Sequence, residues 1–244
     1  MASVNTAVNT KLEGRFITIE IDGLETVSGA LGDLRRKSPA ALKVAVNQTA
    51  RQTRKWMIAA AKARYVVNAA GQRHLNDLKT NKKATNADPS ATLFISKMRN
   101  DLGYFENKPR AVYTGRAAAA RKGTVYQARV LREHGLSDLT GTANPYDPKD
   151  GDYSKGFLAK FKSGHIGMVQ RIIGSDSGRT TTESGRPRWR NRQGKVEKLV
   201  TMGSPSATAM HTQVWPMVED DVEAYLVARL RERVDWILAR AGKV

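Results

Sequence analysis

The stretch that most constrains the fold runs from residue 38 to about residue 65, SPAALKVAVNQTARQTRKWMIAAAKARY, and it predicts one long helix. Ser38 can cap the amides of the first turn, and Pro39 suits the first helical position, where its missing N–H would be unpaired anyway. Apolar and small residues recur at steps of three and four, namely Leu42, Ala45, Val46, Thr49, Thr53, Trp56, Met57 and Ala60. The spacing predicts a narrow apolar seam that packs on another element.

The other side of this predicted helix is basic. Its cations are Lys43, Arg51, Arg54, Lys55, Lys62 and Arg64. Two interpretations are open: the solvated back of a helix packed on its own domain, or a basic face, formed by Arg51, Arg54, Lys55, Lys62 and Arg64, that contacts a partner.

Charge is the dominant feature of the composition. The chain has 244 residues, and 41 Lys and Arg against 23 Asp and Glu give a net charge of +18. Such a field attracts polyanions, of which nucleic acid is the commonest, although acidic protein surfaces also fit. The chain has no cysteine, which excludes disulfides, thiolate nucleophiles and cysteine-bound zinc.

The length suits one good-sized domain or two small ones. No run approaches the roughly twenty apolar residues that cross a bilayer, and the start, MASVNTAVNTKLEGR, lacks the apolar stretch of a secretory signal. We therefore expect a cytosolic product that does not contact a membrane.

The first part of the chain is predicted to alternate between strand and helix. Residues 1–15 are expected to form a flexible arm, and residues 16–22, FITIEID, alternate like a half-buried strand. A short helix is predicted over residues 24–37. Asn68 can cap a further helix that runs through Leu75 and Leu78, and residues 80–90 read as a polar loop.

The second part is richer in short strands. Strand candidates are residues 91–98, 111–114, 124–132, 157–161, 167–173 and 196–202. A Lys-Ser-Gly-His turn with glycines on both sides of His165 predicts that 157–161 and 167–173 form a hairpin. Residues 133–155, rich in Gly, Pro, Asp and Asn, are predicted to be a long loop that lies at an interface or is disordered in the free protein.

The chain ends in helices. Ser204 is expected to cap a short helix opened by Pro205, and Pro216 to start a long one with acidic residues in its first turn and Arg240 near its end. Its apolar stripe is Val218, Val222, Tyr225, Leu226, Leu230, Val234, Ile237 and Leu238. The predicted fold is α+β: a single domain over residues 16–244 with a mostly antiparallel sheet, two long amphipathic helices, and long loops at 133–155 and 174–195.

The segment 174–195 is the best candidate for contact with nucleic acid. Its candidate contact residues are Arg179, Arg186, Arg188, Trp189, Arg190, Arg192 and Lys195. Arginine forks bind phosphates and tryptophan can stack on bases. The alternative is a basic loop that keeps the protein soluble or binds an acidic neighbour.

Signals for catalysis are weak. The histidines, His74, His134, His165 and His211, lie in four different segments and none belongs to a metalloprotease helix motif. The acidic stretch with Asp147, Asp150 and Asp152 lacks the closing glutamate of a calcium loop, so we expect no metal and no cofactor. His165, with His134 as partner, is a possible general base, but a turn histidine between glycines is more typical of a structural role.

Three stretches together resemble the minor tail protein Z family of tailed bacteriophages. They are AVNQTARQTRKWMIAAAKARYVVNAAGQRHL (45–75), FLAKFKSGHIGMVQRI (157–172) and VEKLVTMGSPSATAM (196–210). The second is similar to a family hairpin, Phe-x-Ala followed by Ser-Gly-His-x-Gly-x-x-x-Arg. The third differs from the family's Gly-Pro-Ser by an inserted serine, Ser204, and residues 76–155 match poorly.

The resemblance implies a non-catalytic virion protein at the head-proximal end of the tail. Its expected partners are copies of itself in a six-fold or twelve-fold ring, other neck and tail proteins (portal or adaptor, tail terminator, tube), and the packaged double-stranded DNA. It would occur in the host cytoplasm during assembly and later in the neck of the virion. Two rivals are a free-standing DNA- or RNA-binding protein and a nuclease that uses His165 and the Asp147 to Asp152 cluster.

Overall fold

The computed structural model describes residues 7–97, 101–110, 126–139, 157–173 and 197–242. It has an α+β fold, as predicted, with antiparallel sheets and two long helices. The chain divides into two compact units. The first unit comprises Met1–Ala63, Arg73–Met98 and Ser206–Val244, and the second comprises Arg64–Gln72 and Arg99–Pro205. The prediction of a single domain over 16–244 therefore differs from the structure, because residues of the second unit bury a separate hydrophobic cluster.

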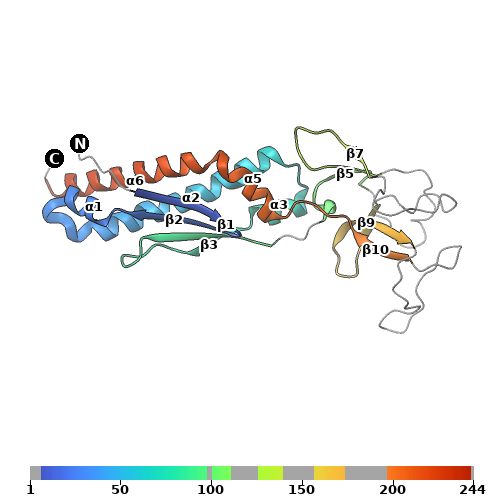
Figure 1. Cartoon of the computed structure of the whole chain (residues 1–244), viewed down its shortest axis with the longest axis horizontal. Coiled ribbons are helices and arrows are strands. Elements are labelled where there is room, and N and C mark those ends of the chain that lie inside the picture. Colours follow the sequence, from blue (N-terminus) through green and yellow to red (C-terminus); the bar gives the residue numbers. More distant parts are fainter. Residues whose placement is uncertain (1–6, 98–100, 111–125, 140–156, 174–196, 243–244) are drawn as a thin grey trace. The chain divides into compact units, whose positions relative to one another are not determined.

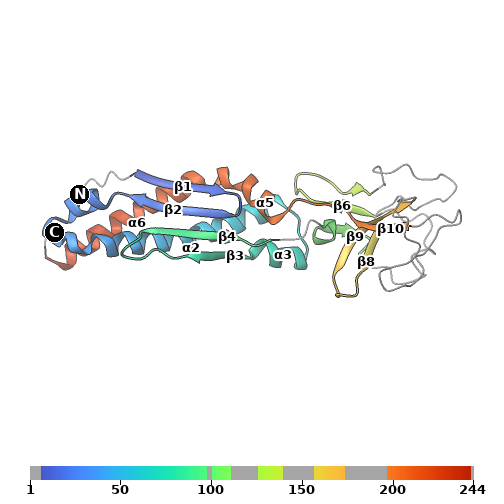
Figure 2. The same ribbon diagram turned by 60° about the horizontal axis from the view of Figure 1, so that its bottom comes forward.

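The first unit is built on a four-stranded antiparallel sheet. Its strands are β1 (Ala7–Glu13), β2 (Phe16–Asp22), β4 (Ser90–Ile95) and β3 (Leu78–Lys82), in the order β1-β2-β4-β3. Figures 1 and 2 show the long helices α2 and α6 along one face of this sheet. The alternation predicted for β2 is confirmed, since Ile17, Ile19 and Ile21 are buried toward the helices.

The prediction of a flexible arm is wrong for Ala7–Glu13, which form β1 and pair with β2 along their whole length. The connection is a two-residue turn, in which Gly14 has φ +55° and Arg15 has negative φ, the pattern of a type II′ hairpin. The predicted polar loop 80–90 is likewise wrong at its start, because residues 80–82 belong to β3. In both cases pairing with a neighbouring strand stabilises a sequence that is mostly polar.

The helices follow the predicted order. Those of the first unit are α1 (Leu24–Leu31), η1 (Gly32–Lys37), α2 (Ser38–Arg64, except its last residue), α5 (Ala207–Val214), η4 (Trp215–Met217) and α6 (Glu219–Arg240). The helix α3 (Ala69–Asn76) is divided between the units, with residues up to Gln72 in the second and those from Arg73 in the first. Ser38 does not cap α2, because the preceding residues are already helical; its buried hydroxyl pairs with that of Ser28 at 3.2 Å. The predicted cap at Ser204 is also wrong, since Ser206 accepts from the amide of Ala209.

The core of the first unit lies where the helix stripes meet the sheet. Val222, Leu226, Leu230 and Val234 of α6 are fully buried, as their spacing predicted. On α2 the buried residues are Ser38, Ala41, Leu42, Ala45, Val46, Thr49, Ala50, Thr53, Met57 and Ala61. Among the helices that the structure describes, none has the length and apolar character to span a membrane.

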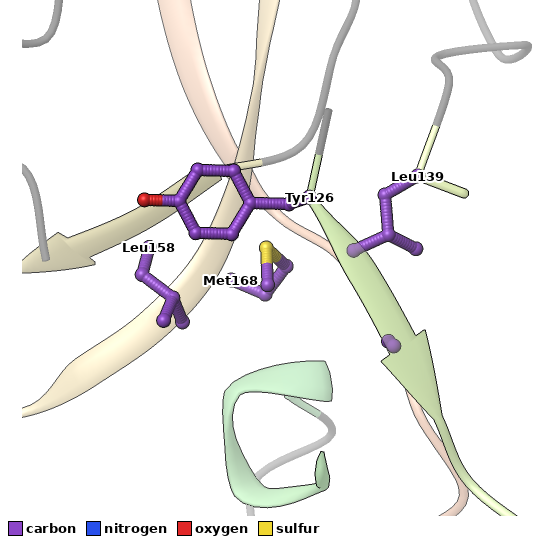
Figure 3. Close-up of a cluster of buried hydrophobic side chains, with 5 residues drawn as sticks. Tyr126, Leu139, Leu158 and Met168 are labelled. Atoms are coloured by element: carbon purple, nitrogen blue, oxygen red, sulfur yellow. The ribbon is translucent and has the colours of Figure 1, made fainter. Parts of the chain in front are cut away.

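The second unit contains two three-stranded antiparallel sheets. One has the order β10 (Glu197–Thr201), β9 (Ile166–Ile173), β8 (Phe157–Lys160), and the other β5 (Glu106–Lys108), β6 (Gln127–Arg129), β7 (Ser137–Asp138). The predicted hairpin around His165 is confirmed as β8 and β9. The second unit has a buried hydrophobic cluster, which consists of Tyr126, Ala128, Leu139, Leu158 and Met168 (Figure 3).

Two predictions for this unit meet the structure only in part. The long loop 133–155 contains the short strand β7, which pairs with β6, and its residues from 140 onward lie outside the described residues. The strand candidate 111–114 and the loop 174–195 also lie outside them.

The predicted cap of α3 is confirmed. The side-chain oxygen of Asn68 accepts hydrogen bonds from the amides of Ala70 and Gly71 at 3.1 and 3.0 Å.

Candidate functional site

The residues of the predicted basic face of α2 differ in their contacts. Arg51, Arg54 and Lys55 are exposed. Arg54 also donates to the backbone carbonyl oxygens of Leu78 and Asn76, so it fixes α2 to the start of β3. Lys62 is half-buried, and Arg64 belongs to the second unit, where its guanidinium lies 6.0 Å from the ring centroid of Tyr65.

The arginine-rich candidates lie outside the described residues. These are Arg179, Arg186, Arg188, Trp189, Arg190, Arg192 and Lys195, together with Asp147, Asp150 and Asp152 of the weak calcium-like stretch. In the described ranges no three His, Asp or Glu side chains are placed to hold a metal ion.

A surface of opposite charge lies at the start of α6. Glu219, Asp220 and Asp221 occupy its first turn, where negative charge is favoured by the helix dipole. Glu223, one turn on, accepts a hydrogen bond from the hydroxyl of Thr10 on β1 at 2.9 Å. The acidic turn is therefore anchored against an edge strand of the sheet.

An open groove of about 590 Å³ runs beside this acidic turn. Val8 of β1 lines it, together with Asp220, Glu223, Ala224, Val227, Ala228 and Arg231 of α6. Small and apolar residues form its floor, and both signs of charge stand at its rim. No local pattern indicates this groove, because it depends on β1, in a segment that was predicted to be a flexible arm.

Arginines and aromatic rings alternate along another ridge of α6. The guanidinium of Arg229 lies 5.0 Å from the ring centroid of Tyr225, and those of Arg233 and Arg240 lie 4.0 and 4.8 Å from the ring of Trp236. Trp236 is 44% exposed. Arg229 also pairs with Glu232. The spacing of Arg229, Arg233, Trp236 and Arg240, in steps of four, three and four residues, is a sequence signal that could have predicted this ridge. Arginines next to aromatic rings can bind nucleic acid or an acidic protein surface.

The histidine of the predicted hairpin contacts a buried carboxylate. His165 Nε2 lies 2.6 Å from Asp101 Oδ2, and the other carboxylate oxygen of Asp101 accepts from the amides of Gly103 and Met168 at 2.7 and 2.9 Å. Asp101 is 1% exposed, and the His165 ring stacks on Phe161 with the centroids 5.7 Å apart. This pair fastens the hairpin to the turn η2 (Leu102–Tyr104).

The close contact between η2 and β9 explains why Gly103 and Gly167 have no side chain. A Cβ on Gly103 would lie 2.9 Å from the Cα of Gly167, so the backbones of η2 and β9 touch. The predicted partner of His165 is not found there: His134 is exposed and lies 3.9 Å from Glu133. The arrangement fits a structural role for His165, because within the described residues its ring pairs with Asp101 and with no hydroxyl nucleophile.

His211, on α5, is the buried histidine of the first unit. Its Nε2 lies 3.3 Å from the carbonyl oxygen of Leu75, to which it donates. Its Nδ1 is buried without a partner among the described residues. Burial lowers the pKa of His211 from 6.5 to about 4, so the ring is neutral near pH 7 and suits packing rather than proton transfer.

Comparison with known proteins adds no relative. No protein-family model matches the chain, and no curated protein or solved structure matches it significantly. The similarity to the minor tail protein Z family therefore rests on the three short stretches of sequence.

Proposed function

We propose that this chain is a non-catalytic structural protein of a tailed bacteriophage virion, a ring-forming tail-completion or neck component at the head-tail junction. The observation that carries the proposal is that the first unit presents unlike surfaces on different helices: exposed Arg51 and Lys55 on α2, and the acidic turn with its groove at the start of α6. Unlike surfaces on one chain favour head-to-tail contacts, which generate a ring when the rotation closes.

The second unit contains the Ser-Gly-His-x-Gly stretch on which the resemblance partly rests, and its contacts support the same proposal. Gly167 allows close contact with Gly103, and His165 binds Asp101, so the Ser-Gly-His-x-Gly stretch builds a rigid hairpin. A motif used for rigidity fits a protein that works through contacts with neighbours. The expected neighbours are copies of the chain in a six-fold or twelve-fold ring, the portal or adaptor, the tail terminator and the tube.

The experiment is light scattering after size exclusion, combined with negative-stain imaging, on the purified chain over a range of concentrations. We expect closed rings of six or twelve copies and weak binding to a short DNA duplex. A monomer or dimer that binds duplex tightly, with an affinity that falls steeply with salt, would overturn the ring proposal.

That outcome would favour the second candidate, a free-standing DNA- or RNA-binding protein. The net charge of +18 and the arginine and tryptophan ridge on α6 are the observations that favour it. The two candidates are separated by the Trp236→Ala and Arg233→Ala variants, which should weaken binding to nucleic acid in the second case and leave ring formation intact in the first.

A further inference from the structure

The two edges of the four-stranded sheet differ in how they are protected against pairing with another strand. The edge strand β3 contains a register irregularity between Thr80 and Lys82, and its residues after Leu78 are exposed and include two lysines. Bulges and edge lysines are the usual devices by which proteins prevent the addition of a further strand.

Side chains of α2 also occupy the ends of β3. Asn47 donates to the carbonyl oxygen of Ala84, just beyond the strand, and accepts from the amide of the same residue, both at 3.0 Å. Arg54 donates to the carbonyl oxygen of Leu78 at the other end. Backbone groups at both ends of this edge are therefore satisfied within the chain.

The edge strand β1 is less protected in the described part of the chain, because it carries one lysine, Lys11, and no register irregularity. It pairs with β2 in continuous register over seven residues. The two-residue turn makes Glu13 and Phe16 a hydrogen-bonded pair. Along an antiparallel strand, residues alternate between hydrogen-bonding to the partner strand and pointing their N–H and C=O away from it. The backbone groups of Val8, Thr10 and Leu12 therefore point away from β2. The described residues supply no backbone partner to these three.

The groove described above lies beside this edge. Ala224, Val227 and Ala228 leave room on the α6 side of β1, and Val8 borders the same space. A strand added to β1 would direct every second side chain toward α6. Added strands gain affinity from main-chain hydrogen bonds and specificity from such spaces for alternate side chains.

The charges at the rim indicate which strand would fit. Asp220, Glu223 and Arg231 line the groove, and Glu219 and Asp221 lie in the same turn as Asp220. Acidic side chains therefore outnumber basic ones here, which favours an inserted strand that is basic. A copy of this chain, with a net charge of +18, can supply one.

We propose that β1 accepts an extended basic segment of a neighbouring copy as a fifth strand of the sheet, with its alternate side chains in the groove beside α6. The contact is heterologous, because the groove and the inserted segment are different surfaces, and so it can repeat around a ring. This inference rests on the ring proposed above and names the contact that builds it.

The test removes one outward-facing amide. Val8→Pro deletes an N–H that β2 does not use, and proline is tolerated at a sheet edge. Val8→Ala is the matched control, because it trims the side chain and retains the amide. We expect Val8→Pro to weaken self-association about tenfold, the effect of losing roughly one hydrogen bond, and Val8→Ala to weaken it clearly less. Association is measured by light scattering over a concentration series.

A second pair of variants tests the charge. Asp220→Lys reverses a rim charge, and Asp235→Lys makes the same change at an exposed position of α6 that does not line the groove. We expect Asp220→Lys to weaken association about tenfold or more, with less effect at high salt, and Asp235→Lys to leave it near wild type. This pair decides the question if Val8→Pro proves unfolded by circular dichroism.

Hydrogen exchange supplies a direct readout of the strand. The amides of Thr10 and Leu12 should exchange slowly in the assembled protein and rapidly after dilution to the monomer. If wild type forms rings and both Val8→Pro and Asp220→Lys form them equally well, the β1 contact is refuted and the proposed function stands. If wild type stays monomeric at every concentration, or stops at a two-fold dimer, both the contact and the ring are refuted.

Discussion

Replacement of His211 tests how far a buried, neutral histidine makes the first unit sensitive to acid. His211 is fully buried and its pKa is lowered from 6.5 to about 4 by burial, while the hydrogen bond to Leu75 opposes this shift. Its Nδ1 has no acceptor nearby in the described part of the chain, so a proton placed there would be unpaired. We therefore expect His211→Gln, which can retain a donor toward Leu75, to change the dependence of stability on pH.

The magnitude follows from linkage. Between the folded and unfolded pKa values the unfolded chain binds the extra proton, so stability falls as the pH drops below 6.5 and the loss is complete below about 4. At about 1.4 kcal/mol per pKa unit, the full loss is about 3 kcal/mol. At pH 5 the same relation gives about 2 kcal/mol. Well above pH 6.5, where neither state binds the extra proton, His211 contributes no slope.

The assay is urea unfolding followed by far-UV circular dichroism at pH 7 and pH 5. The free energy of unfolding of wild type should drop by about 2 kcal/mol more than that of His211→Gln between these values. Equal slopes for wild type and His211→Gln would refute the argument that buried His211 resists protonation.

Three further substitutions and one control variant test packing and hydrogen bonding within the two units. Gly103→Ala should lower the free energy of unfolding by about 2 kcal/mol in urea titrations, because the new Cβ would lie 2.9 Å from backbone atoms, whereas Gly203→Ala meets open space and should be neutral. Leu226→Ala should cost about 2–5 kcal/mol by the same measurement, since its side chain is fully buried. Asn47→Ala should lower the free energy of unfolding by about 1–3 kcal/mol and speed hydrogen exchange at the amide of Ala84. Unchanged exchange there would contradict the claim that Asn47 holds the backbone next to β3.

The long elements could be predicted because their signals are local. The bounds of α2 follow from the periodicity around Leu42 and Met57, and β2 follows from its three alternating isoleucines. The hairpin β8–β9 follows from the turn before His165. The pattern that predicts each of these elements lies within the segment itself, so the prediction does not depend on contacts with distant residues.

The missed features depend on contacts between distant residues. The stretch AVNTKLE becomes β1 only because Gly14 folds it back on β2. Ser38 resembles a cap until the preceding residues are known to be helical. The contact of His165 with Asp101 joins residues 64 positions apart, and neither residue has a local signal for the other. The groove beside α6 could not be predicted for the same reason, since it forms where α6 lies beside Val8 of β1, a strand that the local pattern did not reveal.

The open edge at β1 also has a consequence for the free protein. In the described part of the chain the outward amides and carbonyls of Val8, Thr10 and Leu12 have no backbone partner, so they can pair with other extended polypeptides. The free protein is therefore expected to aggregate at high concentration. A neighbour that covers β1, as in the proposed ring, would remove this hazard, and dilute handling in the laboratory would reduce it.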